Sequence, residues 1–356
     1  MHNLCNVQME KCAIILKLLI SIIGSIKMEW RIKHIFNFTD EKTWKNGYGQ
    51  FGFHDYEGKF YLIRNEASWF GCLTEKDEFL WTAGSTDPNL SSTHIYFDLK
   101  NPMYVSRHPK EKSIIISSGG NKKIFKFFPE DKKAEVLIDA QKHGLKDIGN
   151  CVFDKEGNIW INEITGYRIW QFDLEGKKMC VVGDGKPGFQ EGTVNCENAQ
   201  FNWIYDIRIG PDNNLYILDS RNYTLRMIDF DLGKVIVIAG TGKPGYSGDG
   251  GLATEATFGS DKSEKFDGPW AISLDEEGNI FIGDTHNHVV RMVEKKSEMI
   301  STIAGNSSYI PSKKNLINET NLFKINLPKI CSMDYYNKEL FIPEWDGDLI
   351  VLEKIN

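Results

Sequence analysis

Three segments of the chain share one pattern of apolar and polar positions. Residues 154–173 (DKEGNIWINEITGYRIWQFD), 210–229 (GPDNNLYILDSRNYTLRMID) and 275–294 (DEEGNIFIGDTHNHVVRMVE) align without gaps. In each segment a turn leads into an apolar strand, an acidic residue, a second turn and another strand. A further strand follows each segment (KKMCVVG, KVIVIAG or MISTIAG). The pattern predicts a β-protein built from one repeated antiparallel unit.

Weaker copies of this unit extend the repeat along the chain. They cover residues 54–73, 108–128 and 334–355, so the chain holds six units. The last unit lacks its final strand, whereas a spare strand-like segment at residues 28–38 precedes the first unit. We therefore expect an all-β fold, a six-bladed β-propeller of four-stranded antiparallel blades, closed by the N-terminal strand. Closure removes the unpaired sheet edges that otherwise promote aggregation.

The stretch AGTGKPGYSGDGG at residues 239–251 contains G-x-G-x-x-G, the fingerprint of dinucleotide-binding sites. Such a site needs the glycines to open a helix directly after a strand. Pro244 and the further glycines up to Gly251 disfavour a helix here. A second copy of the loop begins at Gly183, and two copies indicate a repeated connection rather than one cofactor site. We expect both glycine loops to join blades and to bind no dinucleotide.

These residues resemble the NHL-repeat family of six-bladed β-propellers. The bacterial-type repeat of that family carries a loop of the form AGTG…GYSGDGG.AT.A, followed by P.(G/A)IA.D..GN.Y..D..N…R. Residues 239–293 match this pattern closely, with AGTGKPGYSGDGGLATEATF and then GPWAISLDEEGNIFIGDTHNHVVRMV. The resemblance covers roughly residues 45–356, and its copies in the first two units and the last are degenerate. It implies the fold more strongly than the function, because such propellers include lyases, RNA binders and protein-binding platforms.

Composition and charge narrow the function classes. The 356 residues are 41% hydrophobic and 26% charged, which is ordinary for a chain with a large core. The net charge of −7 disfavours nucleic acid as a partner, because phosphate binding needs a basic face. The seven cysteines include no C-x-x-C pair, so a zinc ribbon or a redox motif has no support. We expect a monomeric propeller without a cofactor.

The N-terminus is the one compositional exception. Residues 12–26 form an apolar run that Lys17 interrupts, and the run is short for a membrane span of about 20 residues. Residues 1–27 are either a signal or anchor segment, or sequence upstream of a true start at Met28, and residues 28–356 form the propeller domain. The first alternative predicts an exported or membrane-anchored protein, and the second a cytoplasmic one.

We expect a ligand site at the mouth of the central channel, where the innermost strand of each blade begins. Aligning the repeats places there Gln50, Met103, Gly149, Tyr205, Trp270 and Lys329. This mixed aromatic and polar mouth predicts a ligand that is polar or anionic at one end and apolar along its body. The alternative is that these side chains only plug the channel. The candidate ligand contacts are Arg64, Asn150, Tyr205, Asp206, Trp270, Lys329 and Glu344.

Other repeated polar positions suit structural roles. An acid before a turn, such as Asp219 or Asp284, is expected to accept hydrogen bonds from backbone N–H groups two or three residues on. Three residues after the acid stand Gly166, Asn222 and Asn287, which tolerate left-handed backbone. Arg226 and Arg291 share one position and are expected to span blades. His286 and His288 lie in one turn without further ligands nearby in the repeat, so no metal site is expected.

The leading hypothesis is a non-catalytic propeller that binds a small molecule, a peptide or a protein at the channel mouth. The alternative is an enzyme similar to the gluconolactonase-like and strictosidine-synthase-like propellers. The gluconolactonase resemblance implies a divalent cation held by Glu, Asn and Asp at the strand openings. This chain has no carboxylate there, although Asn150 and Asp206 stand one position away. An RNA-binding NHL domain is the third hypothesis, which the acidic composition disfavours.

Overall fold

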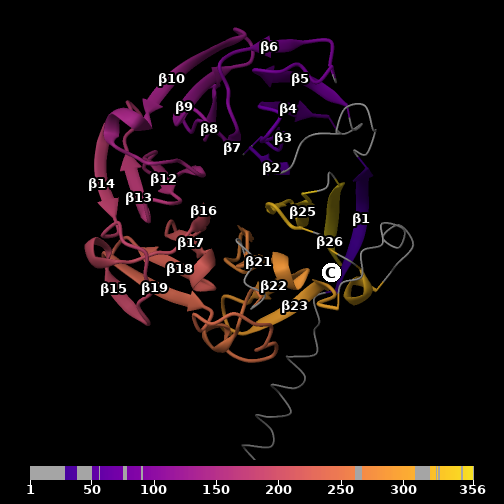
Figure 1. Ribbon diagram of the computed structural model, residues 1–356. Coiled ribbons are helices and arrows are strands. Elements are labelled where there is room, and N and C mark those ends of the chain that lie inside the picture. Colours follow the sequence, from indigo (N-terminus) through magenta and orange to yellow (C-terminus); the bar gives the residue numbers. More distant parts are fainter. Residues whose placement is uncertain are drawn as a thin grey trace, which may run out of the picture.

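The computed structural model describes residues 29–37, 50–55, 57–74, 78–89, 91–260, 267–308, 321–325, 327, 329–345 and 348–355. Its strands form six sheets arranged as blades around one axis (Figure 1). The expected all-β, six-bladed propeller is thus confirmed. Residues 1–27, which we assigned to a signal, an anchor or an upstream segment, lie outside the described residues.

The first three blades follow the chain in order. The first contains β2 (Gln50–His54), β3 (Phe60–Arg64), β4 (Trp69–Leu73) and β5 (Phe79–Gly84), with β6 (His94–Tyr96) added in parallel to β5. The second contains β7 (Pro102–Arg107), β8 (Ile114–Ser118), β9 (Lys123–Phe128) and β10 (Lys133–Asp139). The third contains β11 (Cys151–Phe153), β12 (Ile159–Glu163), β13 (Arg168–Phe172) and β14 (Lys178–Val182).

The remaining three blades complete the ring. The fourth contains β16 (Ile204–Ile209), β17 (Leu215–Asp219), β18 (Thr224–Asp229) and β19 (Lys234–Ala239), and β15 (Thr193–Asn195) pairs with β19. The fifth contains β20 (Ala271–Leu274), β21 (Ile280–Asp284), β22 (Val289–Val293) and β23 (Ile300–Gly305). The sixth contains β24 (Asp334–Tyr336), β25 (Glu339–Pro343), β26 (Asp348–Ile355) and β1 (Glu29–Asn37).

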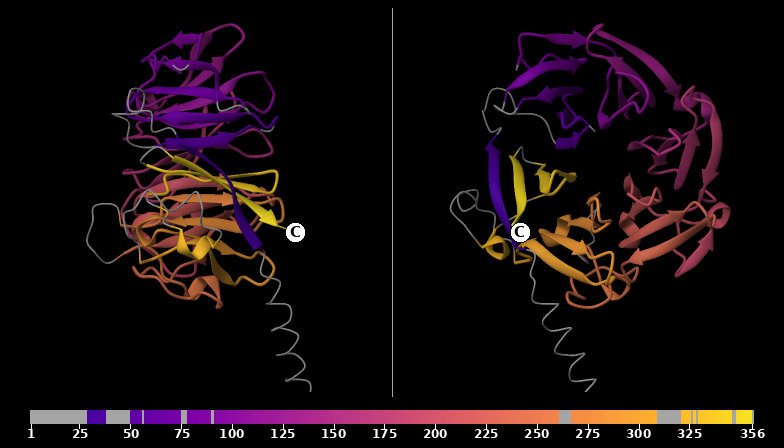
Figure 2. Two further views of the ribbon diagram at one scale, coloured as in Figure 1. Left: turned by 90° about the vertical axis from the view of Figure 1, so that its right-hand side faces the viewer. Right: turned by 180° about the vertical axis from the view of Figure 1, so that it is seen from behind.

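The strand β1 joins the two ends of the chain in one sheet. It pairs antiparallel with β26, from Glu29 opposite Ile355 to Asn37 opposite Asp348. Figure 2 shows β1 beside the yellow C-terminal strands, on the outside of the sixth blade. The Trp30 ring packs edge-on against Phe281 of the fifth blade, with 5.5 Å between ring centroids. The strand therefore binds the last blade and also contacts its neighbour.

Helical structure is sparse in the described part of the chain. It consists of short 3-10 helices, of which η4 (Ala253–Glu255) lies in the second glycine loop. No helix among the described residues has the length and apolarity needed to cross a membrane. Strand pairing and the packing of apolar side chains between blades therefore carry the fold.

The second glycine loop folds back on itself instead of opening an α-helix. The Gly240 N–H donates to the Ala253 carbonyl over 2.9 Å, and the Gly245 N–H to the Phe258 carbonyl over 3.0 Å. Gly240 has a φ of +93°, and a Cβ atom at this position would lie 2.3 Å from the Tyr223 carbonyl oxygen. Glycine is therefore required here by the close approach of two backbone segments.

The turn after the acidic position differs from the sequence prediction. Left-handed backbone falls one residue later than expected, at Tyr167, Tyr223 and His288, with φ between +50° and +59°. The Asn222 side-chain amide instead donates to Asp219 over 2.8 Å, and the Asn287 amide to Asp284 over 2.9 Å. The prediction that these Asn and Gly residues adopt left-handed backbone was therefore wrong. The asparagines occupy their position because their side chains bind the acid, and not because of their backbone geometry.

Gly166 has a different reason to lack a side chain. A Cβ atom there would lie 1.9 Å from Cδ of Glu163, the longer acid of the third blade. A shorter aspartate thus pairs with an asparagine three residues on, whereas this glutamate occupies the space that the asparagine side chain would need.

Candidate functional site

The turns between the second and third strands of each blade lie on one face of the ring with the glycine loops. The Asn287 amide donates to the carbonyl oxygens of Gly245 and Gly259, over 3.0 and 2.8 Å. The Asn222 amide likewise donates to the Gly188 carbonyl over 2.7 Å. We call this side of the ring the funnel face. The innermost strands β2, β7, β16 and β20 begin here, because each runs antiparallel to a second strand that ends at these turns.

Four aromatic rings from three blades meet at the funnel face. Tyr205 stacks on Trp270 at 5.4 Å between ring centroids and 11° between ring planes. Trp270 also contacts His286 edge-on at 5.3 Å and Trp345 at 5.8 Å. Trp270 is only 7% exposed, whereas the other three rings are partly accessible. The repeat alignment placed Tyr205 and Trp270 at the channel mouth, and in the structure their rings are in direct contact.

A β-bulge directs Tyr205 to this position. In the pairing of β16 with β17, Ile204 lies opposite Asp219 and Asp206 opposite Leu218, so Tyr205 is the extra residue. Bulges of this kind redirect a side chain and are frequent next to binding sites. The bulge also leaves Asp206 on the strand face that carries Arg208, two residues later.

Asp206 lies in a polar cluster inside the ring. The Asn150 amide donates to Asp206 Oδ1 over 2.5 Å, and the Ile272 N–H donates to Oδ2 over 3.0 Å. Arg208 forms an ion pair with the same carboxylate. Burial raises the pKa of Asp206 to about 6, although Arg208 and these hydrogen bonds oppose the shift. The structure therefore brings Asn150 and Asp206 together, in contacts that join the third, fourth and fifth blades.

The Arg208 side chain extends the cluster to the other three blades. Its guanidinium lies 4.9 Å from the ring centroids of Phe53 and of Tyr104, which belong to the first and second blades. It donates to the Met333 carbonyl, which precedes β24 of the sixth blade, over 3.4 Å. Contacts of Asp206 and Arg208 thus reach all the other blades. This arrangement supports the channel-plug alternative for Asn150 and Asp206, and ligand contact at these two residues stays a prediction.

The same cluster does not suit a divalent cation. A gluconolactonase-like site moved by one position would use Asn150 and Asp206, of which only Asp206 is an acid. The Arg208 guanidinium already forms an ion pair with the Asp206 carboxylate. A second cation at this position would be repelled by Arg208. Within the described ranges, no group of three or more His, Cys, Asp or Glu side chains is placed to hold a metal ion.

The other three predicted contacts flank the junction of the first and sixth blades. Arg64 ends β3 and is buried, and burial lowers the pKa of Arg64 to about 10, so it stays charged at neutral pH. Lys329 is exposed, and its carbonyl accepts the Trp345 N–H over 2.8 Å. Glu344 is buried and forms a β-bridge with Ile330. Ligand binding by these residues stays a prediction.

The acids of the repeat are bound by the preceding loop rather than by their own turn. Asp219 Oδ1 accepts the Asn202 N–H over 2.7 Å, and Asp284 Oδ1 accepts the Gly259 N–H over 2.8 Å. Glu163 accepts the Lys146 N–H over 2.6 Å. The prediction that each acid accepts hydrogen bonds from backbone N–H groups two or three residues later was therefore wrong. The structural role is the same in kind, because each acid fastens an incoming loop to a blade.

The repeated arginines brace the glycine loops. Arg291 is fully buried, pairs with Asp249 at 2.7 Å and donates to the carbonyl oxygens of Ser247 and Thr257. Arg226 is also fully buried and donates to the Gln200 carbonyl over 2.6 Å. Both side chains thus connect a blade to the loop that precedes it, and these contacts do not reach a strand of another blade.

Sequence reasoning missed three residues of this region. Arg208 stands two positions after the predicted Asp206, and strand periodicity alone would have placed the two side chains on one face. Trp345 follows the predicted Glu344 directly. His286 was assigned to an ordinary turn, yet its ring contacts Trp270. None of the three occupies a position that the repeat alignment singles out.

Comparison with known proteins supports the fold and a relationship to NHL-repeat proteins. No protein-family model matches the chain. It is 36% identical over 147 residues to the chloroplastic protein SUPPRESSOR OF QUENCHING 1 of Arabidopsis thaliana, covering 39% of this chain and 13% of that protein. It is 26% identical over 164 residues to NHL repeat-containing protein 2 of Gallus gallus, covering 41% of this chain and 22% of that protein. The matches thus span less than a quarter of either relative.

Solved structures with the same fold have diverse roles. An auxiliary nutrient binding protein from Bacteroides ovatus has a TM-score of 0.61 at 12% identity, over 93% of this chain and 78% of that one. Virginiamycin B lyase from Staphylococcus aureus has a TM-score of 0.53 at 13% identity, over 92% and 100%. A luciferin-regenerating enzyme has a TM-score of 0.57 at 10% identity, over 91% and 96%. At these identities the likeness concerns the fold alone.

Proposed function

We propose that the protein is a monomeric, non-catalytic binding propeller with bacterial-type NHL repeats. Its ligand is a small molecule with an anionic end and an apolar body, bound at the funnel face. The observation that carries the proposal is the cluster of Tyr205, Trp270, His286 and Trp345, which three blades bring together. Aromatic rings offer a large contact area at a low cost in conformational entropy.

Charge supports the anionic end of the ligand. Arg64 lies at the funnel end of β3 and keeps its charge. Lys329 is exposed, and it directly precedes Ile330, which forms a β-bridge with Glu344 in the sixth blade. The first and sixth blades are neighbours, since the Gly52 N–H donates to Ser332 Oγ over 3.1 Å. Two cations therefore flank one blade junction. The polar cluster around Arg208 lies on the inner strands and limits how deep a ligand enters.

The proposed role agrees with the binding function of structural neighbours such as the nutrient binding protein, and it does not depend on a metal ion. A lyase or hydrolase is the alternative, as virginiamycin B lyase shares the fold. For either reaction the chain would need an acid or base that acts on the ligand. The buried carboxylates of Asp219 and Asp284 are already bound by backbone N–H groups.

The test is a binding screen of small carboxylates with apolar bodies that carry no amine, read by calorimetry and by thermal shift. We expect the substitutions Trp270→Ala and Arg64→Ala each to weaken binding of a hit at least tenfold. Trp345→Ala, at a more accessible ring, is expected to act in the same direction. Trp81→Ala on the opposite face of the first blade is the matched control and should bind as the wild type does.

Two outcomes would contradict the proposal. If Trp270→Ala and Arg64→Ala remain folded by circular dichroism and keep full affinity, the ligand binds elsewhere. If mass spectrometry shows that a bound hit is converted to a product, the protein is an enzyme, and the non-catalytic assignment is wrong.

A further inference from the structure

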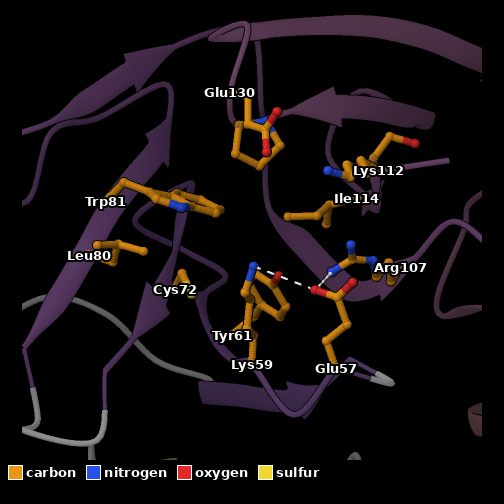
Figure 3. Close-up of a pocket in the computed structure, with 12 residues that line it drawn as sticks. Glu57, Lys59, Tyr61, Cys72, Leu80, Trp81, Arg107, Lys112, Ile114 and Glu130 are labelled. Atoms are coloured by element: carbon orange, nitrogen blue, oxygen red, sulfur yellow. Dashed lines mark ion pairs between the residues drawn. The ribbon is translucent and has the colours of Figure 1, made fainter.

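A cavity of about 380 Å³ lies between the first and second blades (Figure 3). It is lined by residues of the turn before β3, by β3 to β5, and by the ends of β7, β8 and β9. Arg64 ends β3 at the funnel face, whereas Lys59 precedes the other end of this strand. The cavity therefore opens on the face opposite the funnel, and its volume lies within the range of small-molecule sites.

One wall of the cavity is apolar. Tyr61, Cys72 and Trp81 lie directly opposite one another on β3, β4 and β5, so their side chains form a row on one face of the first blade. Burial raises the pKa of Cys72 to about 11, so the thiol stays neutral and behaves as an apolar surface. Ile114 faces this row from the second blade, and Leu80 is 60% exposed at the edge.

The other side of the cavity is charged. Arg107 pairs with Glu57 at 2.7 Å and with Asp55 at 3.1 Å, and Lys59 lies 3.7 Å from Glu57. Figure 3 shows Arg107 and Glu57 across from Trp81 and Leu80. Lys112 and Glu130 add one exposed cation and one exposed anion to the lining. The two signs are balanced, so the site favours a ligand that carries both charges over a simple anion or cation.

We propose that this cavity binds a free aromatic amino acid. The aromatic ring packs against the row of Tyr61, Cys72 and Trp81. The α-carboxylate faces Lys112, and the α-ammonium group faces Glu130. The site is separate from the proposed funnel site, so a negative result at one site does not contradict the proposal for the other.

The experiment uses L-phenylalanine as the probe and isothermal titration calorimetry as the measurement. Two analogues test the two charged groups of L-phenylalanine separately: 2-phenylethylamine lacks the carboxylate, and 3-phenylpropionate lacks the amine. We expect L-phenylalanine to bind at least tenfold more tightly than either analogue. No saturable binding of L-phenylalanine overturns the proposal. Binding of either analogue that equals that of L-phenylalanine and is lost in Trp81→Ala overturns the assignment of a zwitterionic ligand, whereas funnel binding of an analogue persists in that variant.

Two variants and one control locate the site. Trp81→Ala should weaken L-phenylalanine binding at least tenfold, and Glu130→Gln should weaken it about threefold to tenfold while leaving the melting temperature unchanged. The second result separates a binding role from a structural one, because the Glu130 side chain is exposed. Trp345→Ala at the funnel face is the control and should bind as the wild type does. Wild-type affinity in both pocket variants overturns the proposal.

Discussion

At the scale of single residues, the buried acids of the repeat carry an electrostatic cost. Asp219 and Asp284 are fully buried, and burial raises the pKa of each carboxyl to about 6, against an ordinary value of 3.8. Hydrogen bonds from Asn222 and Asn287 oppose that shift without cancelling it. The folded protein thus keeps protons on these groups at a pH where the unfolded chain has lost them.

This difference predicts how stability depends on pH. Between pH 4 and pH 6 these two carboxyls bind more protons in the folded state than in the unfolded state, so their contribution to the free energy of unfolding falls as the pH rises. For Asp284 a shift of about two pKa units corresponds to about 3 kcal/mol across this window. We expect the free energy of unfolding of Asp284→Asn, measured by urea unfolding at several pH values, to fall less steeply with rising pH than that of the wild type.

The matched control for this measurement is Asp231→Asn, at an exposed position. It should leave the slope of the wild type unchanged. A slope in Asp284→Asn that equals the wild-type slope between pH 4 and pH 6 would contradict the prediction, and would mean that the carboxyl titrates alike in both states.

At the scale of elements, the repeat made most strands predictable. Alternating apolar positions and the turn residues recur in every unit, so six blades followed from the pattern of segments such as 210–229 and 275–294. The contact of Tyr205 with Trp270 was also predictable, because both open innermost strands of neighbouring blades. These features depend on local periodicity and on the order of the repeats.

Features that depend on side-chain packing between blades were not predictable. The contacts of Arg208 with Phe53 and Tyr104 join residues more than 100 positions apart, and no repeated position marks them. The cavity beside Trp81 lies between the first two units, whose repeats are degenerate, and its volume depends on how far each side chain reaches. Sequence patterns predict which face of a strand a side chain lies on more readily than they predict the volume of a cavity between blades.

The glycine loop gives a prediction at the element scale. Gly240→Val would place a branched side chain at a φ of +93°, with its Cβ atom 2.3 Å from the Tyr223 carbonyl oxygen. Backbone strain of this kind costs about 1–3 kcal/mol before the clash is counted, so we expect a loss of at least 2 kcal/mol by chemical denaturation. Gly251→Ala is the control in the same loop, because a Cβ atom there meets its nearest atom at 3.4 Å.

The same two variants test the loop against a nucleotide site. A structural loop predicts that NAD and ATP fail to bind the wild type at micromolar concentrations. Saturable nucleotide binding that disappears in Gly240→Val, while Gly251→Ala retains it, would contradict the structural interpretation of G-x-G-x-x-G in this chain.

At the scale of the whole molecule, the ring depends on contacts between segments distant in sequence. The polar cluster of Asp206 and Arg208 joins the inner strands of the blades, and the pairing of β1 with β26 joins the two ends of the chain. Without β1 the sixth blade would keep three strands, and β26 would present an unpaired edge (Figure 2). An exposed edge of this kind is a template for association with other chains.

Deleting residues 28–38 tests the closure of the ring. We expect the shortened protein to melt at a markedly lower temperature and to form oligomers or aggregates in size-exclusion chromatography, because Trp30 and the hydrogen bonds of β1 are lost together. Deleting only residues 1–27 is the matched control, since it leaves β1 in place, and it should preserve the melting temperature and a monomeric elution volume. An unfolded protein after deletion of residues 1–27, or a stable monomer after deletion of residues 28–38, would show that β1 does not close this ring.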